Sequence, residues 1–504
     1  MSVAILKSRA QFGITAPDVT IEVFLSGGLP TFSIVGLAET AVRESKDRVR
    51  AAIQSSSFSF PQERIIVNLG PADMRKSGGR FDLAVALGIL AAHGQVPIEV
   101  VAGFEFYGEL ALDGAVRAVP GVLPAALQAR ACGRPVFVPE QNIDEALLAG
   151  AEVYAASSLL QVAAHLNGEQ QLTAQPAKEQ TDKGVGHYPD LSDVRGQQKA
   201  RRALEVAAAG GHNILFCGPP GTGKSMLAQR LPGILPTASR EESIETAAVD
   251  SILGRPIDLA NWRRRPFRSP HHTASAAALV GGGSNPRPGE ISRAHNGVLF
   301  LDELPEFSRH VLEVLREPME AGRIVISRAS QQAEFPARFQ LVSAMNPCPC
   351  GYLGDPQASC NCSADKVANY RGRISGPLLD RIDIQVTVSR PPKELLRPDA
   401  PAAESTAAVR RRVEDARQLQ TERSGFSNAM LEGHELQRVC DASPESWQLL
   451  EGAMDRFALS ARVHQRVWRV SRTIADLAGV QRITDQHVAE ALSMRFLDRT
   501  MAFG

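Results

Sequence analysis

The chain lacks an uninterrupted apolar run of the roughly 20 residues that a membrane-spanning helix needs. It also lacks the order of residues found in a secretory signal, because Lys7 and Arg9 follow a very short apolar stretch instead of preceding a long one. We therefore expect a cytoplasmic protein without a membrane partner.

The formal net charge of the chain is zero, because its 55 basic and 55 acidic residues cancel. A free-standing nucleic-acid-binding domain is usually basic overall, so any contact with DNA or RNA must be local, for example a basic lining inside a ring. The 504 residues are 44% hydrophobic and 22% charged, which is typical of a soluble globular protein. A chain of this length suggests two to four domains, and we find no internal repeats.

Cysteine is scarce, and its odd count of seven in a reducing compartment argues against disulfides. Four of the seven nevertheless crowd into one loop-like segment as two CxC pairs, Cys348 with Cys350 and Cys360 with Cys362. The scattered Cys132, Cys217 and Cys440 are interpreted as small apolar fillers.

Three blocks divide the chain. Residues 1–167 mix strand-like runs with Ala-rich helical ones, and the polar stretch 168–189 is typical of a linker. Residues 190–395 alternate helices with short apolar strands, the pattern of a parallel α/β sheet. Residues 404–498 are helical by pattern. We expect strands at 20–26, 63–69 and 136–139, and helices at 81–94, 122–131, 461–479 and from Thr484.

The stretch GPPGTGKS, residues 218–225, has the P-loop spacing and lies between an apolar strand and a helical run. Its glycines let backbone N–H groups face phosphates at a helix N-terminus. Lys224 is expected to reach the β- and γ-phosphates, and Ser225 to hold Mg²⁺. A Gly-rich turn before a helix is the plain alternative. The expected contacts to ATP are Gly218, Pro219, Pro220, Gly221, Thr222, Gly223, Lys224, Ser225 and Met226.

A second apolar strand, GVLFLDELPEF at 297–307, ends in Asp302 and Glu303. One carboxylate can fix Mg²⁺ while the other polarises the attacking water. We expect both at the C-terminal end of a strand adjacent to the P-loop strand. An apolar strand followed by two acidic residues is common in general, but downstream of a P-loop it indicates an NTPase.

Four long motifs carry a family resemblance: DLSDVRGQQKARRALEVAAAGGHNILFCGPPGTGKS (190–225), FRSPHHTASAAALVGGGSNPRPGEISRAHNGVLFLDELPEF (267–307), SAMNPCPCGYLGD (343–355) and RGRISGPLLDRIDI (371–384). The chain resembles the magnesium-chelatase-like AAA+ ATPases, within them the YifB/ComM competence-protein family. The resemblance implies a multidomain α/β fold, with an N-terminal Lon-protease-like (S5 domain 2-like) domain, an AAA+ P-loop core and a C-terminal all-α lid.

The resemblance also implies residue roles. Asn346 is similar to the sensor-1 residue that orients the hydrolytic water, and its alternative role is a helix or turn cap. Arg381 resembles the arginine finger offered to a neighbour's ATP, although an ion pair with Asp380 or Asp383 would explain it too. Arg462 resembles the sensor-2 arginine, or is simply a helix-surface arginine. The segment around adenine is expected to include Val194, Gly196 and Gln197.

An arginine that acts in a neighbouring subunit implies a homo-oligomeric ring, by resemblance a hexamer. Two segments could line its channel, residues 268–283 and an expected β-hairpin at 322–339. Packing within the subunit or against a neighbour is the alternative for each. The candidate DNA contacts are Arg323, Arg328, His271 and His272.

The two CxC pairs can supply a tetrahedral thiolate set for Zn²⁺. Such a metal would be structural, because no ligand position is left open for water. Four free thiols are the alternative, and CxC is less usual than CxxC.

The first block, at 63–91 and 108–142, is similar to the proteolytic domain of Lon proteases and to a related domain of RadA. Arg80 stands where the nucleophilic Ser belongs and Leu123 where its Lys base belongs. Without both groups acyl transfer is impossible, so we expect no peptidase activity. Arg75, Lys76 and Arg80 form a candidate basic cluster, or a solvated loop.

The leading interpretation, which the family resemblance implies, is an ATP- and Mg²⁺-dependent DNA motor, a helicase or branch-migration enzyme acting in homologous recombination during natural transformation. Its partners would be single-stranded or branched DNA and recombination proteins. A magnesium-chelatase motor subunit or a protein-remodelling ATPase is the alternative, although a Lon-like block is not part of chelatase motor subunits.

Overall fold

A computed structural model describes residues 2–36, 39, 42, 44–175, 188–283, 285–328, 331–397, 403–495 and 497. Its contacts group the chain into two compact units. The first unit comprises Met1–Gly184, Arg240–Trp262 and Ser327–Phe335, and the second comprises Val185–Ser239, Arg263–Ile326 and Pro336–Gly504. Residues 176–187 of the expected linker lie outside the described residues.

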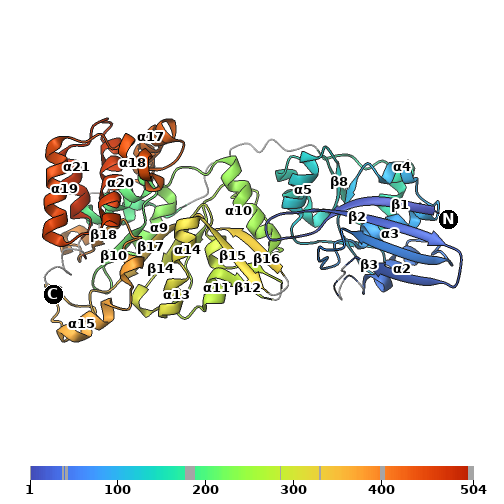
Figure 1. Cartoon of the computed structure of the whole chain (residues 1–504), viewed down its shortest axis with the longest axis horizontal. Helices are drawn as coiled ribbons and strands as arrows, with labels where there is room; N and C mark the ends of the chain where they lie inside the picture. Colours follow the sequence, from blue (N-terminus) through green and yellow to red (C-terminus); the bar gives the residue numbers. More distant parts are fainter. Residues whose placement is uncertain are drawn as a thin grey trace. The chain divides into compact units, whose positions relative to one another are not determined.

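The first unit contains a seven-stranded mixed sheet in the order β3-β4-β2-β1-β5-β8-β9 (Figure 1). Strand β2 buries every second residue, which is the pattern of a sheet with one face on the core. Strands β1, β2 and β4 pair antiparallel, and β5, β8 and β9 continue the sheet in parallel. The strands are β1 Ser2–Arg9, β2 Asp18–Ser26, β3 Thr31–Val35, β4 Arg64–Gly70, β5 Glu105–Phe106, β6 Glu109–Leu110, β7 Val116–Arg117, β8 Val136–Pro139 and β9 Val153–Ala156.

Helix α3 forms the centre of this unit's core, because all its residues from Asp82 to Ala92 are buried. A helix that is apolar all round belongs inside a protein, and α3 packs on β1 and β2. Gly88 permits the close approach, since a Cβ there would lie 2.6 Å from the Val23 side chain. The helices are α2 Ser45–Ser55, α3 Asp82–Ala92, α4 Ile98–Val101, α5 Val122–Ala131, η1 Glu140–Asn142, α6 Ile143–Leu148, α7 Leu159–Leu166 and α10 Arg240–Ile252.

The second unit is built on a five-stranded, all-parallel sheet in the order β11-β14-β17-β10-β18. The expectation that the strand ending in Asp302 lies next to the P-loop strand is wrong, because β17 pairs with both β10 and β14 and separates them. The strands are β10 Ile214–Cys217, β11 Phe267–Arg268, β12 Gly281–Gly282, β13 Arg287–Pro288, β14 Val298–Leu301, β17 Gln340–Met345 and β18 Ile384–Thr387.

Helices cover this sheet and continue into a C-terminal helical bundle, drawn in red in Figure 1. Helix α8 joins the two parts, because it packs against α9 and also against α17 and α20. The helices are η2 Leu191–Asp193, α8 Gln198–Gly210, α9 Lys224–Ile234, α11 Ala276–Val280, α12 Glu290–Arg293, η3 Leu304–Glu306, α13 Arg309–Glu313, α14 Arg316–Ala321, α15 Ala364–Arg371, α16 Gly376–Leu379, η4 Lys393–Leu396, α17 Thr406–Ser424, η5 Asn428–Met430, α18 Gly433–Val439, α19 Pro444–Phe457, α20 Ala461–Leu477 and α21 Asp485–Ser493.

Several local predictions are confirmed. The expected hairpin is present as β15 Arg323–Arg328 and β16 Gln331–Pro336. The helix expected from Thr484 begins there with a capping box, in which the Thr484 and His487 side chains each meet the other residue's backbone N–H. The mixed α/β class with a parallel sheet and a C-terminal helical region is also as expected.

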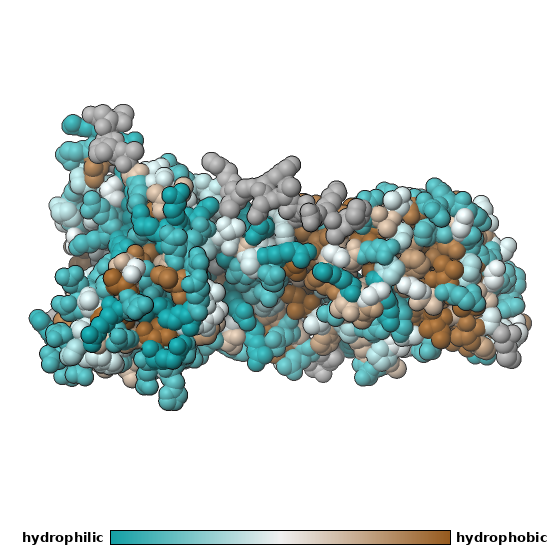
Figure 2. Space-filling view, turned by 90° about the horizontal axis from the view of Figure 1, so that it is seen from above, coloured by the Kyte–Doolittle hydropathy of each residue, from teal (hydrophilic) through white to brown (hydrophobic). Residues whose placement is uncertain are grey.

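The surface carries both polar and apolar regions. Figure 2 shows brown patches among the teal ones across the visible face. The exposed apolar side chains of the first unit include Val3, Ile5 and Leu29. Among the helices that the structure describes, none has the length and hydropathy required to cross a bilayer.

Candidate ATP-hydrolysis site

The P-loop connects β10 to α9 and has the backbone shape that phosphate binding requires. Gly221 and Gly223 have φ angles of 76° and 88°, in the left-handed region that favours glycine. Gly218 packs on the Val388 carbonyl so closely that a Cβ would overlap the oxygen. The loop ends at the N-terminus of α9, whose free N–H groups and dipole attract anions. These features fit the binding of a nucleoside triphosphate.

The Lys224 ammonium is held inside this loop. Only 8% of the residue is exposed, and Nζ donates to the Gly218 carbonyl at 2.7 Å, the Pro219 carbonyl at 2.9 Å and Asn346 Oδ1 at 3.1 Å. Burial lowers the pKa of Lys224, and the nearby Asp302 carboxylate opposes that shift. The contact to Asn346 joins the P-loop lysine to the residue that directly follows β17.

A hydroxyl and a carboxylate, the two expected magnesium ligands, lie beside the lysine. Ser225 Oγ donates to Asp302 Oδ2 at 2.7 Å, and the Glu303 backbone N–H donates to Asp302 Oδ1 at 2.9 Å. Hydroxyl and carboxylate oxygens are the protein ligands that Mg²⁺ prefers, so this pair fits the ion. A cavity of about 470 Å³ opens beside these groups, and it is lined by Pro220, Gly221, Thr222, Gly223, Lys224, Ser225, Met226, Asp302, Glu303, Met345 and Asn346.

Glu303 has a strained backbone and a specific side-chain partner. Its φ of 53° lies in the left-handed region, which costs a non-glycine residue on the order of 1–3 kcal/mol. Its carboxylate, in a side chain that is 53% exposed, lies 3.4 Å from His272 Nδ1. His272 belongs to the 268–283 segment, so a candidate DNA contact touches the candidate base for hydrolysis.

Arg381 and Arg462 are absent from the residues that line this cavity. Arg381 is only 6% exposed and donates to the Pro377 carbonyl at 2.7 Å. Its ion-pair partner is Glu320, while Asp383, an expected alternative partner, pairs with Arg466 at 2.5 Å.

The Arg381 side chain lines a second cavity, of about 340 Å³. Burial lowers the pKa of Arg381; the Glu320 carboxylate opposes the shift, and the positive charges of Arg316 and Arg462 add to it. The charge of one candidate arginine, Arg462, therefore acts on the other, Arg381, although only Arg381 lines this second cavity. The second cavity is lined by Glu313, Arg316, Glu317, Glu320, Ala321 and Arg381.

The segment expected to surround adenine contacts the P-loop through Gln197. The Gln197 side-chain amide donates to the Thr222 carbonyl at 3.2 Å and also to the Ser389 carbonyl. Val194 is buried, and Gly196 approaches Leu395, whose side chain would lie 3.0 Å from an added Cβ. None of Val194, Gly196 and Gln197 lines the 470 Å³ cavity.

The candidate DNA contacts differ in exposure. Arg323 and His271 are exposed, and His272 is half-buried. The His271 and His272 rings lie 4.1 Å apart between centroids. The backbone of Arg328 ends β15, but its side chain lies outside the described part of the structure.

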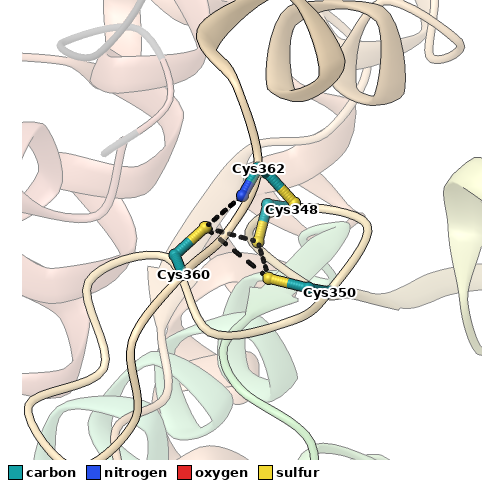
Figure 3. Close-up of side chains that lie close together, drawn as sticks. All are labelled: Cys348, Cys350, Cys360 and Cys362. Carbon is teal, nitrogen blue, oxygen red and sulfur yellow. Dashed lines mark hydrogen bonds between the residues drawn. The ribbon is translucent and has the colours of Figure 1, made fainter.

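The four clustered cysteines converge. Figure 3 shows side chains from both ends of the loop pointing toward one another, and all four sulfurs lie within 4.8 Å of each other. The Sγ atoms of Cys348 and Cys350 are 3.3 Å apart, and each lies 3.6 Å from Cys360 Sγ. All seven cysteines are free. Of the three expected fillers, Cys217 and Cys440 are buried, but Cys132 is exposed.

The prediction that Arg75, Lys76 and Arg80 form an accessible basic cluster in the first unit is wrong, because two of these three residues are buried. Lys76 is fully buried and donates to the Pro71 carbonyl. Arg80 is buried over the Tyr107 ring and donates to the Gly121 carbonyl at 3.3 Å. Side chains enclosed in this way cannot reach DNA phosphates.

Sequence reasoning missed the groups that support the site. Glu320 holds Arg381, and Tyr370 lies against the backbone N–H of Asn346. No spacing rule connects these distant positions. Arg466 had a detectable signal, because it follows Arg462 by one helical turn and so shares its face of α20.

Comparison of the sequence with known protein families identifies which families its parts match. Residues 190–396 match the family described as "Magnesium chelatase, subunit ChlI", residues 21–142 match "Subunit ChlI of Mg-chelatase", and residues 403–495 match "Magnesium chelatase, subunit ChlI C-terminal". The magnesium-chelatase 38 kDa subunit of Cereibacter sphaeroides is 26% identical over 223 residues, covering 40% of this chain and 59% of that protein.

Two relatives match along nearly the whole length. Competence protein ComM of Haemophilus influenzae is 49% identical over 506 residues, covering 99% of each chain. The protein YifB of Escherichia coli K12 is 46% identical over 503 residues, covering 99% of this chain and 98% of its own. The chain therefore belongs to the magnesium-chelatase-like AAA+ ATPases, in their YifB/ComM competence-protein family.

Proposed function

We propose that this protein hydrolyses ATP with Mg²⁺ and uses the energy to move DNA, as a helicase or branch-migration enzyme in homologous recombination during natural transformation. The carrying observation is the convergence of Lys224, Ser225, Asp302, Glu303 and Asn346 on one cavity. Between them they offer a phosphate-binding cation, a magnesium-binding pair, a base and a water-orienting amide. The name of the relative ComM supports the link to competence.

The DNA part of the proposal draws support from His272. A ligand that contacts the 268–283 segment and draws His272 away would free the Glu303 carboxylate, because the two now lie 3.4 Å apart. Single-stranded or branched DNA bound by His271, His272 and Arg323 would then raise ATP turnover. Recombination proteins would be partners of such a motor in the cytoplasm.

The protein would assemble into a homo-oligomeric ring, which by family resemblance is a hexamer. The support for this ring is that neither Arg381 nor Arg462 lines the cavity formed by its own P-loop. An arginine in that position would complete a neighbour's site, where it stabilises the charge of the transition state. Arg381 must exchange its pairing with Glu320 for that role.

The remaining assignments are also proposals. The first block, 1–167, would be a Lon-protease-like domain without peptidase activity, followed by the 168–189 linker, the 190–395 AAA+ core and the 404–498 lid. The side chains of Arg80 and Leu123 support the loss of catalysis, since a guanidinium and an alkyl group cannot act as nucleophile and base.

The test is ATP turnover with a panel of DNA structures, together with strand displacement on a branched junction. Single-stranded or branched DNA should raise turnover, Lys224→Ala should abolish both activities, and Lys366→Ala, which removes an exposed lysine of α15, should change neither. His272→Ala should reduce the stimulation by DNA. DNA-independent turnover without displacement of any junction would refute the DNA motor. Stimulation by unfolded protein, or support of porphyrin metalation, would favour the alternatives instead.

A further inference from the structure

We propose that Cys348, Cys350, Cys360 and Cys362 bind one Zn²⁺, and that this metal holds Asn346 and the P-loop in their hydrolytic arrangement. Binding of the metal stands by itself, whereas its effect on turnover rests on the proposed ATPase function.

The sulfur positions fit a tetrahedral thiolate site. A zinc–sulfur bond of about 2.3 Å places the sulfurs of a regular tetrahedron about 3.8 Å apart. The measured separations are 3.3, 3.6 and 3.6 Å, and all four sulfurs lie within 4.8 Å of one another. These distances exceed the roughly 2.05 Å of a disulfide bond, so the thiols are gathered without being joined (Figure 3).

The loop has no apolar core of its own. Between Pro349 and Asn361 most residues are exposed or half-buried, and Gly351 alone is buried. A segment of this length without an apolar core is ordered by a cross-link or a metal, because packing cannot offset its conformational entropy. A four-thiolate metal supplies that constraint.

One end of the loop follows the candidate water-orienting residue Asn346 directly, and the other end returns to its neighbourhood through α15. The loop leaves β17 through Asn346 and Pro347, and it returns through Cys362 into α15, whose N-cap is Ser363. Helix α15 then reaches back, because Arg371 Nε donates to the Pro347 carbonyl at 3.2 Å. The metal would therefore close a ring of chain that starts and ends beside Asn346.

The loop also touches the P-loop. A Cβ added to Gly351 would lie 2.7 Å from Cδ of Pro220, so the backbone beside Cys350 packs directly on the phosphate-binding loop. Farther along, Asp355 accepts a hydrogen bond of 3.0 Å from Arg390 Nε, beyond β18. Removing the metal would release three contacts at once, to Asn346, Pro220 and Arg390.

The first experiment measures metal in the purified full-length protein. Elemental analysis should find about one Zn²⁺ per chain, and exchange into Co²⁺ should produce the strong visible absorption of tetrahedral cobalt thiolate. Cys360→Ser and Cys362→Ser should lose the metal. Cys132→Ser, which alters an exposed thiol outside the cluster, should keep it. Zinc-free protein that binds neither Zn²⁺ nor Co²⁺ overturns the proposal.

The second experiment tests the coupling on protein that has already folded. Zinc is removed with a thiol-modifying mercurial and chelator, the thiols are restored with reductant, and Mg²⁺ is supplied in excess for the ATPase assay. Because a displacement of about 1 Å can cost on the order of 100-fold in rate, kcat should fall at least tenfold and recover when Zn²⁺ is returned. Circular dichroism should show an intact fold.

A separate variant distinguishes this inference from the ATPase proposal. Asn346→Ala should lose turnover while it retains zinc. Zinc-free protein that hydrolyses ATP at the full rate would overturn the coupling and leave the ATPase proposal intact. Protein that binds zinc but never hydrolyses ATP would refute the ATPase proposal and the coupling, and would leave only the metal site.

Discussion

Arg381 should complete the active site of a neighbouring subunit, and mixing two inactive variants tests this directly. Arg381→Ala keeps its own P-loop but offers no guanidinium, whereas Lys224→Ala offers Arg381 but cannot cradle the phosphates. Neither variant alone contains a whole site, because Arg381 is absent from the residues around its own P-loop cavity. A site formed between the two variants is complete when the Arg381→Ala subunit supplies Lys224 and the Lys224→Ala subunit supplies Arg381.

The magnitudes follow from this geometry. An arginine finger is worth on the order of 1,000-fold or more in kcat, so Arg381→Ala should lose about 4 kcal/mol of transition-state stabilisation. In a closed ring assembled at random from equal amounts, about one quarter of the interfaces pair an intact P-loop with an intact Arg381. The mixture should therefore recover about one quarter of the wild-type rate.

The assay is steady-state ATP hydrolysis with DNA present, after the subunits are mixed without nucleotide to allow exchange. Arg381→Ala should still bind a fluorescent ATP analogue, which separates loss of chemistry from loss of binding. Arg438→Ala, an exposed arginine of α18 paired with Glu435, is the matched control and should be active alone. Full activity of Arg381→Ala, or a mixture no more active than its components, refutes the reasoning.

Three further outcomes are expected. Gly218→Ala should abolish binding of a fluorescent ATP analogue, because the added Cβ overlaps the Val388 carbonyl; normal affinity would contradict this. Ser225→Ala should raise the Mg²⁺ concentration needed for half-maximal hydrolysis about tenfold, since it removes one member of the magnesium-binding pair, and an unchanged Mg²⁺ dependence would count against that assignment. Burial lowers the pKa of His212 from 6.5 to about 4, so the unfolded chain binds the extra proton first and stability falls as the pH drops through this window. Between pH 6.5 and 5 the loss should be about 2 kcal/mol, measured by urea unfolding, and His212→Gln should remove most of it; an equal loss in that variant would show that other groups are responsible.

The sequence predicted the local parts of this molecule well, because their signals lie within a few residues. The P-loop spacing fixes a strand, a turn and a helix together, and the structure has β10, the loop and α9 in that order. Thr484 was recognisable as a helix start because capping depends on neighbouring residues alone.

Long-range order was harder to predict, for physical reasons. Nothing in the apolar strand before Asp302 specifies which strand it will pair with, and β17 proved to lie between it and β10. Burial was equally hidden: Lys76 and Arg80 look like surface charges in the sequence, yet tertiary packing encloses them. The pairing of Arg381 with Glu320 joins residues that are 61 positions apart.

The position of β17 has a consequence for how this site can change. Since β17 separates β10 from β14, the strand before the P-loop and the strand before Asp302 share no ladder hydrogen bonds in the described sheet. The two halves of the site are joined directly by the side-chain hydrogen bond from Ser225 to Asp302, and replacing either side chain alters that one contact. A substitution within β17, for example at the fully buried Ala344, would instead shift both halves in concert. We therefore expect that strand to tolerate the fewest changes in side-chain volume, although the polar group Asn346 lies just beyond its end.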